Sequence, residues 1–314
     1  MSDILLQVEH LTKQFPAAGG QTLTAVKDVS LAVRRGETVA IVGESGCGKS
    51  TLVKTVLSMH KPTEGKVIFD GKDTTNLHSA AQRDYYRHIQ MVFQDPAAAF
   101  DPKMRVKEIL TEALLNYGII RRRDVQKRAE ELLDIVELPK DFAARYPHNM
   151  SGGQRQRVAI ARALALEPDI IICDEATSAL DVSVQDSIIR LLVRLQKERG
   201  MTYLFICHDL ALVSLFAHRV AVMYLGSVME KIDGDQLSKA QHPYTQALLR
   251  SVFPVSADKT EVKTIAGDLP SPLEMPTGCP FATRCEKCRE VCQKEMPLLK
   301  EVESNHFVAC HLVS

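Results

Sequence analysis

The chain has 314 residues, of which 45% are hydrophobic and 25% are charged, and its 39 basic residues balance its 39 acidic residues. This composition is typical of a soluble globular protein long enough for two domains, and the charge balance argues against a strongly basic protein that coats nucleic acid. The N-terminal residues include no basic stretch, and no apolar run approaches the roughly 18 residues of a membrane-spanning helix. We therefore expect a cytoplasmic chain that does not itself span a membrane.

Strands are predicted in the first part of the chain. Residues 5–8 and 26–33 are rich in apolar side chains, and residues 17–20, with two glycines, favour a tight turn between them. Phe15 stands just before this turn. Residues 38–42 are continuously apolar or β-branched, which is typical of a strand that is buried on both faces.

A glycine-rich stretch follows this last strand and fits the pattern G-x-x-x-x-G-K-[ST]. The next residues carry apolar side chains at helical spacing, so the glycines lie between the end of a strand and the start of a helix. Backbone N–H groups in such a loop and the positive end of the helix favour a bound phosphate. We expect Lys49 to reach the β- and γ-phosphates of a nucleotide and Ser50 to ligate Mg²⁺. The predicted phosphate loop comprises Gly43, Glu44, Ser45, Gly46, Cys47, Gly48, Lys49, Ser50 and Thr51.

Helices are predicted in the middle of the chain. Short strands at residues 66–71 and 90–93 come first, and from about residue 102 to residue 165 the pattern is helical. We interpret this stretch as a helical insertion, with the basic residues 121–123 on a solvated face. Near the end of this insertion, a helix start that contains two glycines predicts a second anion-binding site. This start comprises Ser151, Gly152, Gly153 and Gln154.

A buried strand predicted just after residue 169 ends in two adjacent carboxylates. Asp174 is expected to hold Mg²⁺ opposite Ser50, and Glu175 is expected to orient and deprotonate water. Taken alone, two acids at a strand end could equally cap the next helix. The phosphate loop upstream favours the catalytic interpretation.

Strands alternate with helices along most of the chain, which predicts a doubly wound α/β core. Further strands are predicted at residues 202–207, 220–225 and 228–232. The first of them ends at His208, and a lone histidine at such a place is more often structural than catalytic.

The chain changes character after residue 252, where prolines mark an irregular C-terminal segment with five of the eight cysteines. These five are Cys279, Cys285, Cys288, Cys292 and Cys310. In a reducing cytoplasm such clustering favours a metal over disulfides, and thiolates at short intervals suit either zinc or an iron–sulfur cluster. Zinc stays a rival because His306 and His311 lie close to Cys310 in the sequence.

Taken in order, these motifs resemble the nucleotide-binding subunit of an ABC transporter over roughly residues 5–250. The motifs that carry the resemblance are the phosphate loop, Gln94, residues 151–154, Asp174 with Glu175, residues 178–181 and His208. The resemblance implies that Phe15 stacks on adenine, that Gln94 contacts Mg²⁺ or the attacking water, and that His208 contacts the γ-phosphate. Met150 stands where the family usually has leucine.

The resemblance also implies that ATP is held between two subunits. The phosphate loop of one subunit would face Ser151, Gly152, Gly153 and Gln154 of the other, and Asp181 would communicate across the dimer. ATP binding would close this dimer and hydrolysis would release it, because ATP has a higher affinity for the closed state.

The C-terminal part narrows the resemblance to the ATPase subunits of oligopeptide, dipeptide and nickel importers. Residues 242–249, 267–272 and 278–285 carry it. The family tail implies a [4Fe-4S] cluster on Cys279, Cys285, Cys292 and Cys310, and the additional Cys288 leaves this ligand set open. The implied partners are a second ATPase subunit, expected to be a paralogue, two membrane permeases and an extracytoplasmic binding protein. No nucleic acid is implied, and the expected location is the cytoplasmic face of the cell membrane.

We therefore predict an ABC ATPase domain over residues 1–252, with a parallel-sheet core, an N-terminal antiparallel region and the helical insertion, followed by a cysteine-rich tail over residues 253–314. The predicted function is Mg²⁺-dependent ATP hydrolysis that energises import of an oligopeptide or dipeptide. Import of nickel or another small solute stays open, as does a soluble, non-transport ABC ATPase. A P-loop kinase would leave residues 151–154 and Asp181 unexplained.

Overall fold

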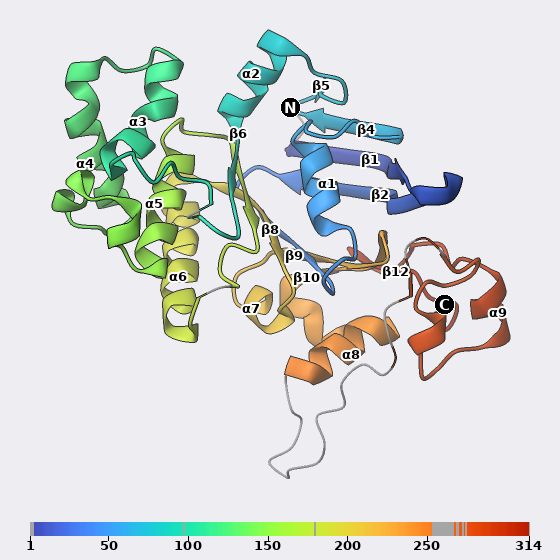
Figure 1. Cartoon of the computed structure of the whole chain (residues 1–314). Helices are drawn as coiled ribbons and strands as arrows, with labels where there is room; N and C mark the ends of the chain where they lie inside the picture. Colours follow the sequence, from blue (N-terminus) through green and yellow to red (C-terminus); the bar gives the residue numbers. More distant parts are fainter. Residues whose placement is uncertain are drawn as a thin grey trace. The chain divides into compact units, whose positions relative to one another are not determined.

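The computed structural model describes residues 3–96, 98–178, 180–252, 267, 270–271, 273 and 275–313. They form two compact units (Figure 1). Unit 1 comprises Met1–Leu77 and Ile206–Ser314, and unit 2 comprises His78–Phe205. The phosphate loop and the described part of the tail therefore fold together in unit 1, whereas the helical insertion belongs to unit 2. Residues 268, 269 and 272 of the tail motif lie outside the described residues.

Unit 1 contains an antiparallel sheet in the order β2-β1-β4-β5. Its strands are β1 (Ile4–Pro16), β2 (Thr22–Arg34), β4 (Glu64–Phe69) and β5 (Lys72–Asp73). β1 and β2 run well beyond the predicted residues 5–8 and 26–33, because polar residues on the exposed face are interspersed among the buried apolar ones. The predicted turn is confirmed as the 3-10 turn η1 (Ala18–Gly20).

A second sheet of unit 1 leads into the phosphate loop. β3 (Thr38–Val42), all five residues of which are buried, pairs in parallel with β9 (Arg219–Tyr224). β9 pairs antiparallel with β10 (Ser227–Asp233), and β10 pairs antiparallel with β12 (His306–Val308). β12 in turn pairs with β11 (Lys300–Glu303). We expected an irregular tail, but its last part adds these two strands to the sheet.

The helices of unit 1 are short. They are α1 (Lys49–Val56), α7 (Leu210–Ser214), α8 (Pro243–Val252) and α9 (Glu290–Lys294), with the 3-10 turns η5 (Gly234–Lys239) and η6 (Ala282–Arg284). Three buried rings join the tail to β9 and α8: Phe281 has its ring centroid 5.3 Å from that of Tyr224 and 5.2 Å from that of Tyr244. The described part of the tail thus shares a hydrophobic core with the rest of unit 1.

Unit 2 combines strands and a block of helices. The strand order is β8 (Thr202–Cys207), whose last two residues belong to unit 1, then β7 (Ile170–Asp174) and β6 (Ile89–Val92), which are parallel to each other. Its helices are α2 (Ser79–His88), α3 (Val106–Asn116), α4 (Val125–Ile135), α5 (Gly152–Leu164) and α6 (Val182–Arg199). Its 3-10 turns are η2 (Arg122–Asp124), η3 (Lys140–Ala144) and η4 (Pro147–Asn149).

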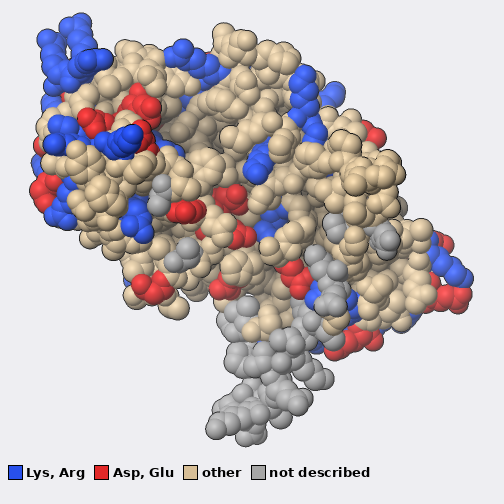
Figure 2. Space-filling model, in the orientation of Figure 1, with Lys and Arg blue, Asp and Glu red and all other residues tan. Residues whose placement is uncertain are grey.

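Helices α3, α4 and α5 pack on one another, which confirms helical structure between about residues 102 and 165. Ala129, Leu132 and Leu133, which share one face in the predicted helix, are buried in α4. Residues 121–123 are exposed, as predicted, and Figure 2 shows Lys and Arg side chains gathered over the end of the α3–α4 hairpin. No helix in the described ranges is long and apolar enough to cross a membrane.

Candidate functional site

The phosphate loop joins β3 to α1 in unit 1. Gly48 caps α1 with a left-handed φ of 104°, and a Cβ added to it would lie 2.1 Å from the carbonyl oxygen of Ala25. Both the backbone conformation and the lack of space therefore require glycine. Because α1 begins at Lys49, the backbone N–H groups of the loop lie at the positive end of this helix.

Carbonyl oxygens of the loop itself hold the Lys49 ammonium group. Lys49 is only 4% exposed, and its Nζ donates to the carbonyl oxygens of Gly43 at 2.7 Å and Glu44 at 3.0 Å. A buried ammonium group needs such acceptors, and ionised oxygens such as those of a phosphate are stronger acceptors than carbonyl oxygens. Phosphate oxygens could therefore compete with the two carbonyl oxygens for this ammonium group.

Phe15 and His208 also lie in unit 1. The Phe15 ring meets the His60 ring edge-on, with centroids 5.4 Å apart, and Lys13 Nζ lies 4.8 Å from its centroid. His208 is exposed between β8 and α7, and the following Asp209 caps α7 by accepting the N–H of Ala211 at 2.8 Å. Phe15 thus lies near the end of β1, in contact with His60 and Lys13, and the exposed His208 directly follows the end of β8.

The two adjacent carboxylates lie in unit 2. β7 ends at Asp174, and Glu175 follows with φ 46°, a left-handed conformation that costs a non-glycine residue about 1 kcal/mol or more. The Glu175 carbonyl oxygen accepts from the N–H and the hydroxyl of Ser178 at 3.1 and 3.0 Å. Gln94 Nε2 donates to the same hydroxyl at 3.3 Å. Ser178 therefore links two predicted site residues, and the strained backbone is typical of a functional position.

Two helix starts meet in the same unit. Ser151 and Gln154 form a capping box at the start of α5, in which Ser151 N–H donates to Gln154 Oε1 at 2.9 Å. Asp181 caps α6 by accepting the Val184 N–H at 3.0 Å, and this hydrogen bond lowers the pKa of Asp181. The two starts are in contact, because a Cβ added to Gly153 would lie 2.4 Å from Val184 Cγ1. The structure thus brings together residues 151–154 and Asp181.

Four of the tail cysteines lie within electrostatic range of one another. Burial raises the pKa of Cys279 to about 12, and the neighbouring Cys292, Cys310 and Cys285 raise it too. The Cys279 N–H donates to the Cys292 carbonyl oxygen at 2.7 Å. Within the residues that the structure describes, however, no group of three or more His, Cys, Asp and Glu side chains could hold a metal ion. The thiols are neighbours without forming a metal centre.

The two histidines near Cys310 have other partners. His306 and Glu230 are both buried, and His306 Nε2 lies 2.7 Å from Glu230 Oε1. His311 Nε2 donates to the carbonyl oxygen of Glu295 at 2.9 Å. These contacts argue against histidine ligands in the alternative zinc site.

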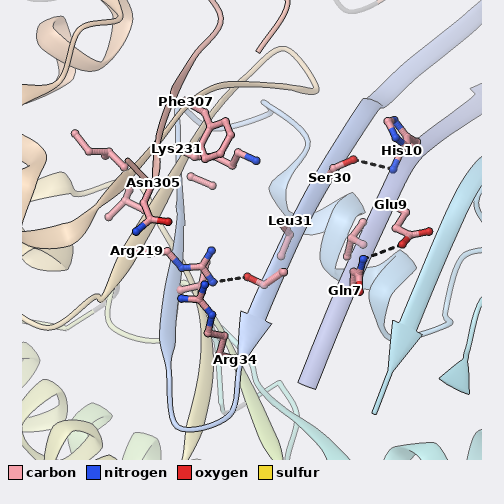
Figure 3. Close-up of a pocket in the computed structure, with 16 residues that line it drawn as sticks. Gln7, Glu9, His10, Ser30, Leu31, Arg34, Arg219, Lys231, Asn305 and Phe307 are labelled. Carbon is pink, nitrogen blue, oxygen red and sulfur yellow. Dashed lines mark hydrogen bonds between the residues drawn. The ribbon is translucent and has the colours of Figure 1, made fainter. Parts of the chain in front are cut away.

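A pocket of about 660 Å³ lies in unit 1, and no predicted site residue lines it (Figure 3). Figure 3 shows the Arg34 and Arg219 side chains side by side at its wall. Arg219 donates to Glu37 Oε2 at 2.6 Å, and Lys231 Nζ lies 4.4 Å from the centroid of the Phe307 ring. Arg219 and Lys231 therefore already have partners in the fold, which makes the pocket a poor second candidate for a nucleotide site.

Two residues that contact the phosphate loop were not predicted. Arg284 forms two hydrogen bonds with the Glu44 carboxylate, of 2.6 and 3.1 Å, and Tyr244 Oη accepts the Glu44 N–H at 2.9 Å. Both residues lie in segments that the sequence analysis used only to recognise the tail, residues 242–249 and 278–285. The partners are 240 and 200 positions from Glu44, so only the fold reveals the contacts.

Comparisons with known protein families match two parts of the chain. A model described as ABC transporter matches residues 26–178. A model described as oligopeptide/dipeptide transporter, C-terminal region, matches residues 230–292.

Individual proteins are similar over most of the chain. It is 46% identical over 324 residues to the oligopeptide transport ATP-binding protein AppF of Bacillus subtilis (strain 168), with 99% of this chain and 98% of that protein covered. Among solved structures, the dimeric post-hydrolysis state of the ATP-binding cassette MJ0796 bound to ADP and Pi gives a TM-score of 0.67 at 35% identity, covering 73% of this chain and 98% of that chain. The structure of cbiO1 from Clostridium perfringens, part of the ABC transporter complex cbiONQ, gives a TM-score of 0.67 at 30% identity, covering 79% of this chain and 96% of that chain.

Proposed function

Because the chain belongs to the ATP-binding subunits of ABC transporters, we propose that it energises the import of oligopeptides or dipeptides through partner membrane permeases. Membership makes the chain an ABC-type ATPase that uses ATP and Mg²⁺. The observation that carries the proposal of a peptide is the match of residues 230–292 to the C-terminal region of oligopeptide/dipeptide transporters. The name of the relative AppF supports the same solute class.

We propose that unit 1 supplies the nucleotide cradle. The loop N–H groups and the Lys49 ammonium group would bind the phosphates of ATP. The ammonium group already lies within the loop, with Lys49 Nζ 2.7 Å from the carbonyl oxygen of Gly43. Ser50, exposed on the first turn of α1, would ligate Mg²⁺. Phe15 would stack on adenine, and His208 would contact the γ-phosphate.

We propose that unit 2 supplies the groups that act on water and the metal. Asp174 and Gln94 would contact Mg²⁺, and Glu175 would accept a proton from the attacking water. The left-handed backbone of Glu175 and its link through Ser178 to Gln94 support this assignment. A proton acceptor near the attacking water contributes roughly 10²- to 10⁴-fold to such a reaction.

We propose that two ATPase subunits hold ATP between them. Ser151, Gly152, Gly153, Gln154 and Asp181 would contact the nucleotide bound to the partner's phosphate loop. The contact between the starts of α5 and α6 supports a shared role for these residues, because one surface presents both motifs. Ser151 is exposed and begins an α-helix of 13 residues, so its end offers backbone N–H groups to an anion.

We propose that residues 1–252 form the ATPase domain and residues 253–314 the transporter-specific tail. The partners would be a second ATPase subunit, two membrane permeases and an extracytoplasmic binding protein. Contact with the permeases would place the chain at the cytoplasmic face of the membrane. The similarity to AppF, which is named as an oligopeptide transport ATP-binding protein, over 98% of that protein supports membrane permeases as partners.

We also propose that Cys279, Cys285, Cys292 and Cys310 hold a [4Fe-4S] cluster. What supports this ligand set is proximity, because Cys279 lies within electrostatic range of Cys292, Cys310 and Cys285, although the described side chains do not form a metal-binding group as they are placed. A bound cluster would crosslink the tail through deprotonated thiols. Analysis of iron, sulfide and zinc after anaerobic purification tests the idea, with Cys288→Ser as the control variant. Stoichiometric zinc without sulfide, or loss of metal in Cys288→Ser, would contradict it.

Purification of the tagged chain from detergent-solubilised membranes tests the transport function. We expect membrane permeases to co-purify and a peptide with its binding protein to stimulate ATP hydrolysis by the complex. A tagged chain that recovers no membrane protein would contradict a transport role. Stimulation by nickel and not by peptides would overturn the proposed solute.

A further inference from the structure

The strongest unassigned feature is an ion pair between the tail and the phosphate loop. Arg284 Nη1 lies 2.6 Å from Glu44 Oε2, and Nη2 lies 3.1 Å from Oε1, so the guanidinium group forms a bidentate ion pair with the carboxylate. The side chain of Arg284 is 6% exposed and that of Glu44 is 27% exposed. A charge pair so shielded from water is stronger than one at the surface, where such pairs contribute little.

Glu44 is fixed from three directions. Its carboxylate meets Arg284, its N–H donates to Tyr244 Oη at 2.9 Å, and its carbonyl oxygen accepts from Lys49 Nζ at 3.0 Å. The Cys47 N–H donates to the same carbonyl oxygen at 3.3 Å. Because the side chain and the carbonyl belong to one residue, a shift of the carboxylate would move an acceptor of the Lys49 ammonium group.

Arg284 is itself held by the fold of the tail. It ends η6, where its N–H donates to the carbonyl oxygen of Phe281 at 3.0 Å, and it directly precedes Cys285. Phe281 packs against Tyr224, whose Oη lies 3.3 Å from Arg284 Nη1. The packing of the tail therefore sets the place from which Arg284 reaches the loop.

We propose that Arg284 is a positioning residue for the phosphate loop, which acts through Glu44 on Lys49, so that the folded tail sets the affinity for nucleotide. This inference depends on the proposed role of the phosphate loop in ATP binding. An ion pair that only docks the tail would change stability alone. A positioning role changes nucleotide affinity in a protein that is still folded.

A double-mutant cycle on the full chain separates these roles. The variants are Arg284→Gln, Glu44→Gln and the double variant, and Arg289→Ala, an exposed arginine of the tail, is the control. The measurements are the dissociation constant for ATP, the KM and kcat of ATP hydrolysis, and the thermal midpoint. We expect each single variant to raise the dissociation constant and KM roughly 10-fold with a smaller change in kcat. The double variant should bind no more weakly than either single variant, and Arg289→Ala should bind like the wild type.

Arg284→Lys provides a second test, because it keeps the charge but cannot form both hydrogen bonds. We expect its affinity to fall between those of the wild type and Arg284→Gln. Folded Arg284 variants that bind ATP like the wild type, or additive effects in the double variant, would overturn the inference. A wild type that does not bind ATP, or a Lys49→Ala variant that binds it normally, would instead overturn the nucleotide site itself.

Discussion

Lys49 is the side chain on which the proposed nucleotide site depends most. The residue is buried against the carbonyl oxygens of Gly43 and Glu44. We expect Lys49→Ala to weaken ATP binding by roughly 100-fold, about 3 kcal/mol, because the substitution removes a charge-assisted contact with the phosphates. Calorimetric titration measures the change. Lys54→Ala, an exposed lysine on the same helix, is the matched control and should keep the wild-type affinity.

Glu175 has a different expected role. We expect Glu175→Gln to keep ATP binding and to lower hydrolysis by roughly 10²-fold or more, because the amide cannot accept a proton from water. Steady-state phosphate release and equilibrium binding, measured on the same preparation, separate the two effects. Glu198→Gln, at an exposed position in α6, is the control. Normal turnover in Glu175→Gln would remove the assignment as general base.

His242 gives a prediction for stability against pH. The residue is 1% exposed, and burial lowers its pKa to about 4. In the unfolded chain this histidine titrates near about 6.5, so between these pH values the unfolded state binds the additional proton. The free energy of unfolding should therefore fall as the pH drops from about 6.5 toward 4, by up to about 1.4 kcal/mol per pH unit.

Denaturant unfolding at pH of about 7.5 and 5.5 measures this slope. His242→Asn is the comparison, because its side-chain oxygen can accept the Tyr244 N–H as Nδ1 does at 3.1 Å. We expect the wild type to lose about 1 kcal/mol more than the variant between the two conditions. Equal losses would show that His242 does not remain neutral in the folded protein.

Individual residues differ in how far the sequence could place them. The sequence predicted the residues of the phosphate loop because their backbone conformation leaves a local pattern of glycines. It could not predict Arg284 as a partner of Glu44, because 240 positions separate the two. His306, considered as a metal ligand, is instead paired with Glu230 through the pairing of β10 with β12. Such contacts depend on tertiary packing and leave no local pattern.

The contact between the starts of α5 and α6 gives a prediction about these elements. A Cβ on Gly153 would lie 2.4 Å from Val184 Cγ1, whereas one on Gly152 would meet Leu180 Cδ2 at 3.4 Å. We expect Gly153→Ala to destabilise the protein by about 1–2 kcal/mol through overpacking. Gly152→Ala should be neutral or slightly stabilising, because alanine favours the helix. Thermal midpoints of the two variants, measured side by side, decide between these outcomes, and equal midpoints would contradict the contact.

The elements themselves were predicted unevenly. A continuous run of apolar or β-branched residues predicted the bounds of β3, because a strand buried on both faces does not alternate apolar with exposed polar residues. The lengths of β1 and β2 were underestimated because their exposed residues interrupt the apolar pattern. The strand β11 was not predicted, since three of the four residues in Lys300–Glu303 are charged and exposed. Its partner β12 lies beside β10 only in the fold.

The described part of the tail is built into unit 1. Its strands extend a sheet, Phe281 shares a core with Tyr224 and Tyr244, and Arg284 reaches the phosphate loop. The match to the C-terminal region of oligopeptide/dipeptide transporters falls on this same part of the chain. The positioning role inferred for Arg284 would link this part of the chain to ATP binding. The order of motifs in the sequence predicted the family, whereas this contact required the structure.

Peptide uptake in cells that lack the chain tests whether ATP hydrolysis by this protein energises peptide import. A labelled tripeptide is supplied to deletion cells that carry the wild type, Glu175→Gln or an empty vector. We predict that only the wild type restores uptake, although both proteins are present at equal levels. Equal uptake with Glu175→Gln, or wild-type uptake in the empty-vector cells, would contradict the claim.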